Sequence, residues 1–139
     1  MNKKRIASNH IINLAQNEIF VFGSNLNGLH GGGAARMAYH HFGAEWGKGV
    51  GLYGHSYAIP TMHGGVSSIK PYVENFLHFA KVHSEFDFLV TEIGCGIAGF
   101  TPQDIAPLFF PAIENDLHNV YLPESFYSVW ELTNNQVMQ

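Results

Sequence analysis

Two glycine-bearing stretches have the residue types and spacing to hold phosphate. The first runs from Gly23 to Ala35 and the second from Ile93 to Phe100, and each follows a strand-like apolar run and precedes a helix-like segment. Backbone N–H groups at a helix N-terminus lack intrahelical partners and lie at the positive end of the helix dipole, so they bind anions. Glycine lets the backbone approach a ligand closely. Two such stretches favour a diphosphate over a single phosphate.

The candidate ligand-binding residues lie at the strand ends and in the loops that follow. Asn25 is typical of an Asx turn that shapes a loop, and this role is compatible with contact to a ligand. Phe100 either joins the core or packs against a sugar face. The candidates are Gly23, Ser24, Asn25, Gly31, Gly32, Gly33 and Ala34 in the first stretch, and Gly94, Cys95, Gly96, Ile97, Ala98, Gly99 and Phe100 in the second.

Three polar residues near the strand ends are candidate catalytic groups. Asn25 is a candidate to place a water molecule, and His30 and His63 are candidate bases, because histidine titrates near neutral pH. The alternative for each histidine is an ordinary surface side chain. The nine histidines show no recognised zinc spacing, so neither a metal nor a cofactor is predicted. Cys95 lacks a base that the sequence can place beside it, which favours a small residue in a tight loop over a nucleophile.

The segment Gly49-Val50-Gly51-Leu52-Tyr53-Gly54 matches the spacing of a dinucleotide-binding fingerprint. That fingerprint follows a strand and opens a helix, whereas here a loop precedes the glycines and a strand follows them. We therefore expect residues 43–54 to form a long, flexible surface loop. A loop of that length beside a ligand site can act as a wall or lid.

The elements that position these stretches alternate between strands and helices. Apolar and β-branched runs predict strands, and helical spacing of apolar residues predicts helices. This alternation predicts an α/β layered fold with a largely parallel central sheet. The predicted strands are 18–22, 56–59, 86–93 and 120–122, and the predicted helices are 33–42, 68–83 and 124–132.

Caps and prolines set the expected helix ends. Ser68 has the side chain of an N-cap for the helix over 68–83. Thr101 and Asp104, with Pro102 between them, come close to a capping box that opens another helix. Two further prolines, at 107 and 111, predict that this helix is limited to short pieces.

Length, composition and charge limit which folds and which partners are expected for this chain. The 139 residues, 46% of them apolar, predict a single domain over 1–139, in which 1–17 is a partly ordered N-terminal segment. The net charge is −4 and three of the seven Lys and Arg residues stand at the extreme N-terminus, so no duplex nucleic acid is expected as a partner. The sequence shows no membrane-spanning run or signal peptide, and its lone cysteine fits a reducing compartment, so a cytoplasmic location is expected and no membrane partner. The oligomeric state stays open.

Three segments in order resemble the macrodomain family, whose members bind ADP-ribose and related nucleotides. Asn25 to Gly43 is similar to the family's first loop and Ala-rich helix, Ser56 to Thr61 to its intervening strand, and Gly94 to Phe100 to its Gly-x-Gly-Ile-x-Gly-aromatic loop. A closer likeness is to a compact macro-like group of phage and bacterial proteins. The resemblance covers residues 18–122. It implies a three-layer α/β/α macrodomain-like sandwich with a mixed, largely parallel central sheet.

The resemblance also implies a place for each part of the ligand. Asn25 would contact the distal ribose, with Gly31, Gly32 and Gly33 around that ribose and the phosphates. Gly96, Ile97, Ala98 and Gly99 would wrap the diphosphate. Phe100 would lie against the distal ribose, and the adenine would sit elsewhere in the cleft.

The catalytic residues of the family have no counterpart in this chain. Ala35 stands where one branch has an Asp, and Met62 and Ala98 stand where another branch has a Lys and an Asp. The acidic residue that grips adenine in many members also has no clear counterpart, since the segment before Glu18 offers Asn9 and His10. These losses remove the groups that would activate water or attack the ribose.

Three functions are therefore open. The leading hypothesis is a module that binds ADP-ribose or a related nucleotide diphosphate between its two glycine-rich loops. The second is an ADP-ribosyl glycohydrolase or ADP-ribose phosphate hydrolase that uses Asn25, His30 and His63 in place of the usual catalytic residues. The third is a protein-partner module with a vestigial cleft.

Overall fold

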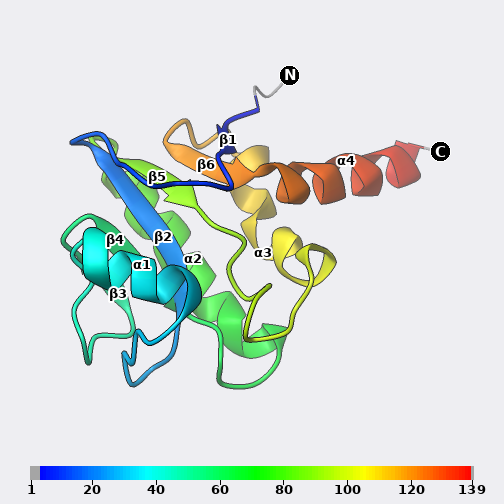
Figure 1. Ribbon diagram of the computed structural model, residues 1–139. Helices are drawn as coiled ribbons and strands as arrows, with labels where there is room; N and C mark the ends of the chain where they lie inside the picture. Colours follow the sequence, from blue (N-terminus) through cyan, green and yellow to red (C-terminus); the bar gives the residue numbers. More distant parts are fainter. Residues whose placement is uncertain (1–3, 139) are drawn as a thin grey trace.

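A computed structural model describes residues 4–138 of the chain, which form one sheet and the helices that cover it. Figure 1 shows the elements in chain order. The strands are β1 (Ile6–Ala7), β2 (Glu18–Ser24), β3 (Gly51–Tyr53), β4 (Ser56–Pro60), β5 (Asp87–Val90) and β6 (Val120–Pro123). The helices are α1 (Gly33–His41), α2 (Val66–Val82), α3 (Pro102–Glu114) and α4 (Glu124–Met138).

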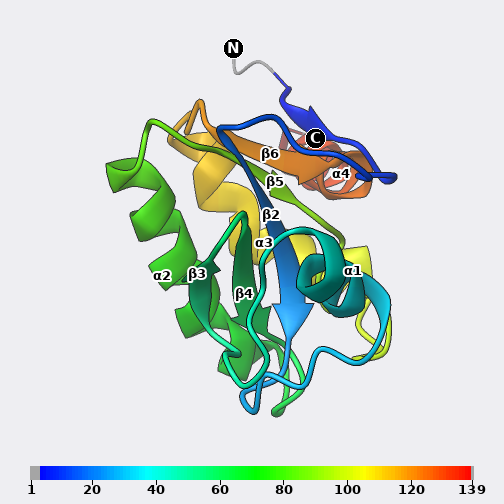
Figure 2. The ribbon, with the colours of Figure 1, turned by 60° about the vertical axis from the view of Figure 1, so that its left-hand side comes forward.

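The strands form a six-stranded sheet in the order β1-β6-β5-β2-β4-β3. Every neighbouring pair is parallel except β3 and β4, which form an antiparallel hairpin at one edge. The sheet is therefore mixed and mostly parallel, as the alternation of strands and helices predicts. The long strand β2 lies between β4 and β5, and all three point the same way (Figure 2).

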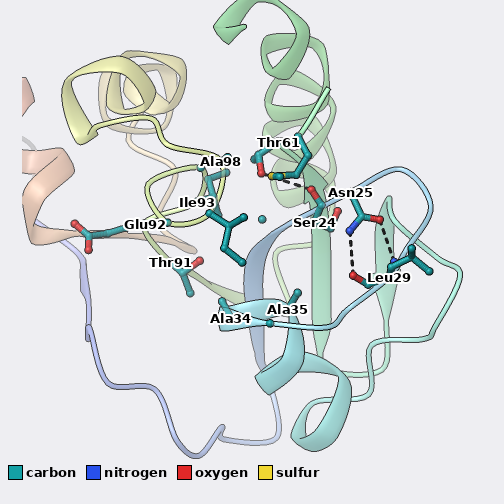
Figure 3. A pocket seen from close by; sticks show the side chains of 17 residues that line it. Ser24, Asn25, Leu29, Ala34, Ala35, Thr61, Thr91, Glu92, Ile93 and Ala98 are labelled. Carbon is teal, nitrogen blue, oxygen red and sulfur yellow. Dashed lines mark hydrogen bonds between the residues drawn. The ribbon is translucent and has the colours of Figure 1, made fainter. Parts of the chain in front are cut away.

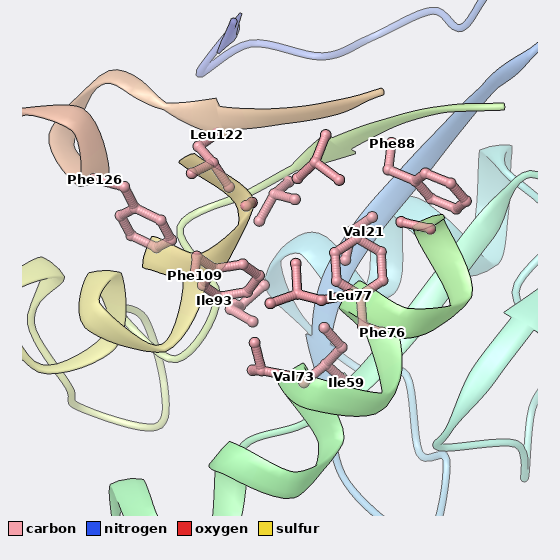
Figure 4. Packing of buried hydrophobic residues seen from close by; sticks show 14 of the residues in the cluster. Val21, Ile59, Val73, Phe76, Leu77, Phe88, Ile93, Phe109, Leu122 and Phe126 are labelled. Atoms are coloured by element: carbon pink, nitrogen blue, oxygen red, sulfur yellow. The ribbon is translucent and has the colours of Figure 1, made fainter. Parts of the chain in front are cut away.

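Helices cover both faces of the sheet, which makes the fold an α/β sandwich. On one face, buried residues of α2, α3 and α4 pack against inward-facing strand residues such as Val21, Ile59 and Phe88 (Figure 4). On the other face, α1 packs against Phe20 and Phe22 of β2. Burying this apolar surface is the main favourable contribution to the stability of the fold.

The start of α3 matches its sequence signature, whereas its interior does not. The Thr101 hydroxyl accepts the Asp104 N–H and the Asp104 carboxylate accepts the Thr101 N–H, so the predicted capping box is confirmed. The prediction that the prolines break this helix is wrong, since α3 is continuous through Pro107 and Pro111. These prolines are four residues apart on one side of the helix, and Pro107 is exposed, so the carbonyls that lose a partner lie near solvent.

Several other element boundaries differ from the predictions. The helix α2 begins at Val66 with Gly65 as N-cap, so Ser68 lies inside the first turn and its hydroxyl donates to the Gly65 carbonyl. The expected loop over 43–54 contains β3, and the strand expected over 86–93 is limited to Asp87–Val90. The last helix continues to Met138 instead of ending at 132.

A short strand within the N-terminal segment also lacks a sequence signature. The strand β1 has two residues and pairs in parallel with β6, where Ile6 lies opposite Leu122. Contacts of Arg5 hold it there, because the Arg5 N–H donates to the Tyr127 hydroxyl and its guanidinium pairs with Asp116. No helix in the described part of the chain combines the length and apolar character needed to cross a membrane.

We expect Thr101→Ala to lower the free energy of unfolding by about 1 kcal/mol, because the cap of α3 is lost. Chemical denaturation monitored by circular dichroism measures this change. Thr133→Ala is the matched control, since Thr133 is exposed and its hydroxyl donates to the Val129 carbonyl within the same helix. We expect the control to change stability by less than about 0.5 kcal/mol. Equal losses in the two variants would contradict the assigned role of the capping box.

Candidate functional site

A cavity of about 340 Å³ lies at the carboxyl ends of β2, β4 and β5, where three parallel strands finish side by side (Figure 3). This volume is within the range of roughly 300–1,000 Å³ that is typical of small-molecule sites. Ligands of open α/β sheets usually bind at this end of the strands. The cavity is lined by Gly23, Ser24, Asn25, Leu29, Gly32, Gly33, Ala34, Ala35, Thr61, Met62, Thr91, Glu92, Ile93, Gly94, Gly96, Ile97 and Ala98.

The first wall of the cavity is the uncapped N-terminus of α1. Its N-cap is Gly32, which has extended backbone and no side chain to accept a hydrogen bond, and the first turn contains no acidic residue. The first intrahelical donor is the N–H of Arg36, which bonds the Gly32 carbonyl. The three preceding N–H groups, of residues 33–35, therefore have no intrahelical partner, and these residues line the cavity.

The second wall is a compact loop between β5 and α3. The Phe100 N–H donates to the Gly94 carbonyl at 2.8 Å and the Gly99 N–H to the Gly96 carbonyl at 3.0 Å, so the loop folds back on itself. Both Gly94 and Gly99 have positive φ, which other residues rarely adopt. Within residues 4–138, no hydrogen bond engages the N–H groups of residues 96–98, all of which line the cavity.

The second wall differs from the expected helix N-terminus. In α3 the capping box engages the Asp104 N–H, Pro102 has no N–H, and no residue of the first turn lines the cavity. The free amides belong instead to the turn that precedes it. The two walls therefore present backbone N–H groups to one cavity by different means, a helix end on one side and a loop on the other.

Asn25 shapes the first loop and also lines the cavity. Its side-chain amide donates to the Leu29 carbonyl and accepts the Leu29 N–H, both at 3.0 Å (Figure 3). A further tether comes from His63, whose Nε2 accepts the Leu26 N–H at 2.8 Å. The His63 ring is exposed and does not line the cavity. The loop that follows β2 is thus held by side-chain bonds at two points.

His30 is buried beneath the first loop, with only 1% of its surface exposed. Its Nε2 lies 2.9 Å from the Glu45 carbonyl and 3.1 Å from the Lys48 carbonyl, so this nitrogen carries the proton and donates. The ring packs edge-on against Phe22 and Trp46. His30 is therefore neither a surface side chain nor a group that reaches the cavity, and it ties the segment 45–48 to the first loop.

The segment 43–54 is mostly exposed, as a surface loop would be, but it contains β3 and its backbone packs against the first loop. A Cβ on Gly49 would lie 2.0 Å from the Asn25 carbonyl oxygen, and a Cβ on Gly28 would lie 2.2 Å from the Lys48 nitrogen. The buried Ser24 hydroxyl donates to the Gly49 carbonyl at 2.5 Å. These glycines let two backbones touch, which explains their presence without a dinucleotide.

Cys95 lies in the second loop but does not line the cavity. Its thiol donates to the Ile93 carbonyl at 3.5 Å. Burial and, to a smaller extent, the nearby negative charges of Glu92 and Asp104 together raise the pKa of Cys95 to about 11. The thiol is therefore protonated at neutral pH, which does not suit a nucleophile.

The structure brings ten of the fourteen candidate ligand-binding residues to the cavity. The four that do not line it are Gly31, Cys95, Gly99 and Phe100, and of the candidate catalytic residues only Asn25 lines it. Sequence reasoning missed Leu29, Ala35, Thr61, Met62, Thr91, Glu92 and Ile93 as lining residues. Thr61 could have been found from its place just after the strand expected over 56–59, whereas Thr91 lies inside the strand expected over 86–93 and follows the strand only in the structure.

Glu92 is the one ionisable side chain that lines the cavity in the described residues. The Ser125 hydroxyl of α4 donates to its carboxylate at 2.5 Å. The lining also includes three apolar side chains that are at least 45% exposed, those of Leu29, Met62 and Ile97. Ile97 reaches toward the first wall, since a Cβ on Gly32 would lie 3.5 Å from its Cδ1 atom.

A second cavity of about 340 Å³ adjoins the first on the side of Glu92. The two cavities share Gly33, Ala34, Thr91 and Glu92. The rest of the second cavity is lined by β2, α1 and the N-terminal segment, through Ser8, Asn9, His10, Ile11, Ile12, Phe20 and Met37. Its lining includes the apolar side chains of Ile11, Ile12, Phe20 and Met37.

No family model, curated protein or solved structure matches this chain. The function is therefore argued from the geometry of the two cavities. The first cavity presents free backbone N–H groups, and the second is lined by several large apolar side chains. This arrangement suits a ligand that is anionic in one half and planar or apolar in the other.

We expect His30→Ala to lower the free energy of unfolding by about 2–4 kcal/mol, because it leaves a cavity and removes the donor to two carbonyls. Urea denaturation measures this loss. His63→Ala is the matched control, since the exposed His63 ring makes a single hydrogen bond to the first loop, and about 1 kcal/mol is expected for it. A His30 variant as stable as the control would contradict the supporting role assigned to His30.

Proposed function

We propose that this chain binds ADP-ribose or a related nucleoside diphosphate, with the diphosphate between its two glycine-rich walls. The observation that carries the proposal is the pair of unpartnered amide sets, of residues 33–35 and 96–98, that line one cavity. No lysine or arginine lines that cavity in the described part of the chain. Backbone donors are therefore the groups that would neutralise the anion.

The adjoining cavities support a ligand with two unlike halves. The diphosphate and the distal ribose would occupy the first cavity, where Asn25 has a polar side chain beside the amides. The nucleobase would occupy the second cavity, between apolar side chains such as Ile11 and Met37. This assignment agrees with the resemblance to macrodomains. We also propose that the fold is a macrodomain-like three-layer α/β/α sandwich.

The lining residues favour binding over hydrolysis. A hydrolase needs a base or nucleophile within hydrogen-bond reach of the reacting atoms. Ala35, Met62 and Ala98 line the cavity and have no titratable side chain. His30 and His63 do not line it, and the Glu92 side chain is directed away from Asn25 and toward α4, where it accepts the Ser125 hydroxyl. We therefore propose a binding module, with ADP-ribose turnover not expected.

We expect ADP-ribose to stabilise the protein more than ADP, AMP or NAD in a thermal-shift series supported by calorimetry. A ligand at a hundredfold excess over its dissociation constant adds about 2.7 kcal/mol of stability. Gly32→Glu is expected to abolish this stabilisation, because its carboxylate would enter the cavity between the amides. Absence of a shift with all four ligands would contradict the proposed function.

Two variants control for the fold and for charge. In Gly32→Ala the added Cβ makes only ordinary contact with Ile97, at 3.5 Å, so the fold and part of the affinity are expected to remain. Gly31→Glu adds the same charge one residue earlier, outside the lining, where a Cβ meets nothing within 4 Å. Loss of binding in Gly31→Glu equal to that in Gly32→Glu would contradict the placement of the anion.

We expect Ile97→Ala to weaken ADP-ribose binding about tenfold, mainly through faster dissociation. The Ile97 side chain is 79% exposed without ligand and would become covered when a ligand lies beneath it. Stopped-flow fluorescence measures the dissociation rate. Leu132→Ala, which truncates a side chain 61% exposed on α4, is the control. Equal effects of the two variants on dissociation would contradict a role for Ile97 over the ligand.

A further inference from the structure

Glu92 stands at the boundary between the two cavities and lines both of them. It directly follows Thr91, whose hydroxyl and N–H both donate to the Val21 carbonyl and so fix the backbone at this point. Figure 3 shows the Glu92 side chain directed away from Asn25 and toward α4. There the Ser125 hydroxyl donates to one carboxylate oxygen at 2.5 Å. One oxygen of this exposed carboxylate is thus engaged by α4, and its other oxygen has no protein partner in the described residues.

The surroundings of Glu92 contain little positive charge. Neither cavity is lined by a lysine or an arginine in the described residues. His10 is the other titratable side chain that lines the second cavity, and it is exposed to solvent. The free amides of residues 96–98 line only the first cavity, whereas Gly33 and Ala34 line both, so the second cavity has backbone donors at one side but no cationic side chain. A phosphate group in the second cavity would therefore meet a fixed negative charge without a cation to offset it.

We infer that Glu92 restricts the site to ligands whose nucleoside half carries no phosphate. This inference rests on the proposed function. An ionised carboxylate accepts hydrogen bonds from a ribose hydroxyl or an exocyclic amine, and it repels a phosphate ester at the same place. Dinucleotide-binding sites distinguish their ligands in the same way. An acidic residue binds the free 2′-hydroxyl of the ribose, whereas a site for the 2′-phosphorylated ligand has an arginine nearby.

The test compares two ligands that differ by one phosphate, ADP-ribose and ADP-ribose 2′-phosphate, by isothermal titration calorimetry. We expect the wild-type protein to bind the phosphorylated ligand at least about tenfold more weakly, as a like charge at close range near a protein surface implies. In Glu92→Gln the ratio of the two dissociation constants is expected to fall toward one. Glutamine has nearly the same shape and keeps one acceptor oxygen, so the charge is what changes.

Two further variants separate a local from a general charge effect. Glu114→Gln removes one negative charge from the exposed end of α3, away from both cavities, and the ratio is expected to stay at its wild-type value. Ser125→Ala frees the Glu92 carboxylate while keeping its charge, so discrimination is expected to persist in weaker form. If Glu114→Gln lowers the ratio of the two dissociation constants as much as Glu92→Gln does, the inference is overturned.

The outcomes distinguish this inference from the proposed function. Failure of the wild-type protein to bind ADP-ribose would overturn the proposed function itself. Binding of ADP-ribose with equal affinity for its 2′-phosphate would leave that function standing and overturn the role of Glu92. Binding with discrimination that Glu92→Gln does not reduce would also overturn it, because the selection would then come from another group.

Discussion

The parallel pairing of β2 with both β4 and β5 is the constraint on which the candidate site depends. Ser24 lies opposite Pro60, and Val21 lies opposite Val90, so the three strands finish at one edge of the sheet. The chains that leave them are very close, since a Cβ on Gly23 would lie 3.2 Å from the Thr61 hydroxyl and 3.4 Å from the Gly94 nitrogen. The two loops must diverge from this point, and the cavity is the space between them.

The helices α1 and α3 differ in whether side chains cap their first-turn amides. In α3, Thr101 and Asp104 bond reciprocally with each other's backbone N–H groups, which leaves little capacity for a ligand. In α1, the N-cap is Gly32 and no side chain takes that role. A glycine cap lowers helix stability by only a few tenths of a kcal/mol relative to serine or asparagine, so the absence of a side-chain cap on α1 destabilises the fold very little. A serine at the same position would bond the amides itself and compete with an anion for them.

The sequence predicts most of the elements because their signals are local. The run before Gly23, the capping box at Thr101 and the glycine after α1 each determine a boundary through neighbouring residues. The continuous α3 and the short strand β1 escape prediction for a physical reason, since both depend on distant parts of the chain. The prolines of α3 are tolerated on its outer side, and β1 forms through contacts of Arg5 with Asp116 and Tyr127.

The site is predictable to the extent that it is made of backbone at strand ends. Ten candidate residues line the cavity because glycine-rich turns after parallel strands meet at one edge. The role of His30 could not be predicted. A histidine near a strand end suggests a catalytic group, and only the packing of Phe22, Trp46 and the segment 45–48 around its ring shows that it supports the first loop. Glu92 gives no signal in sequence, since its importance comes from Ser125, 33 residues away, and from the second cavity.

The support beneath the first loop bears directly on how backbone amides can hold an anion. Amides have no long side chain with which to follow a ligand, so their affinity depends on being correctly placed before binding. The first loop is held against the segment 45–49 by buried His30 and by the close approach of Gly49 to the Asn25 carbonyl. The Asn25 side-chain amide adds hydrogen bonds within the loop. The one charged side chain in the described lining, Glu92, stands at the boundary between the two cavities, where Ser125 of α4 contacts it. Under the proposed function, a diphosphate held by the amides and repelled by this carboxylate would lie in the first cavity, which favours one orientation of a ligand with a single anionic half.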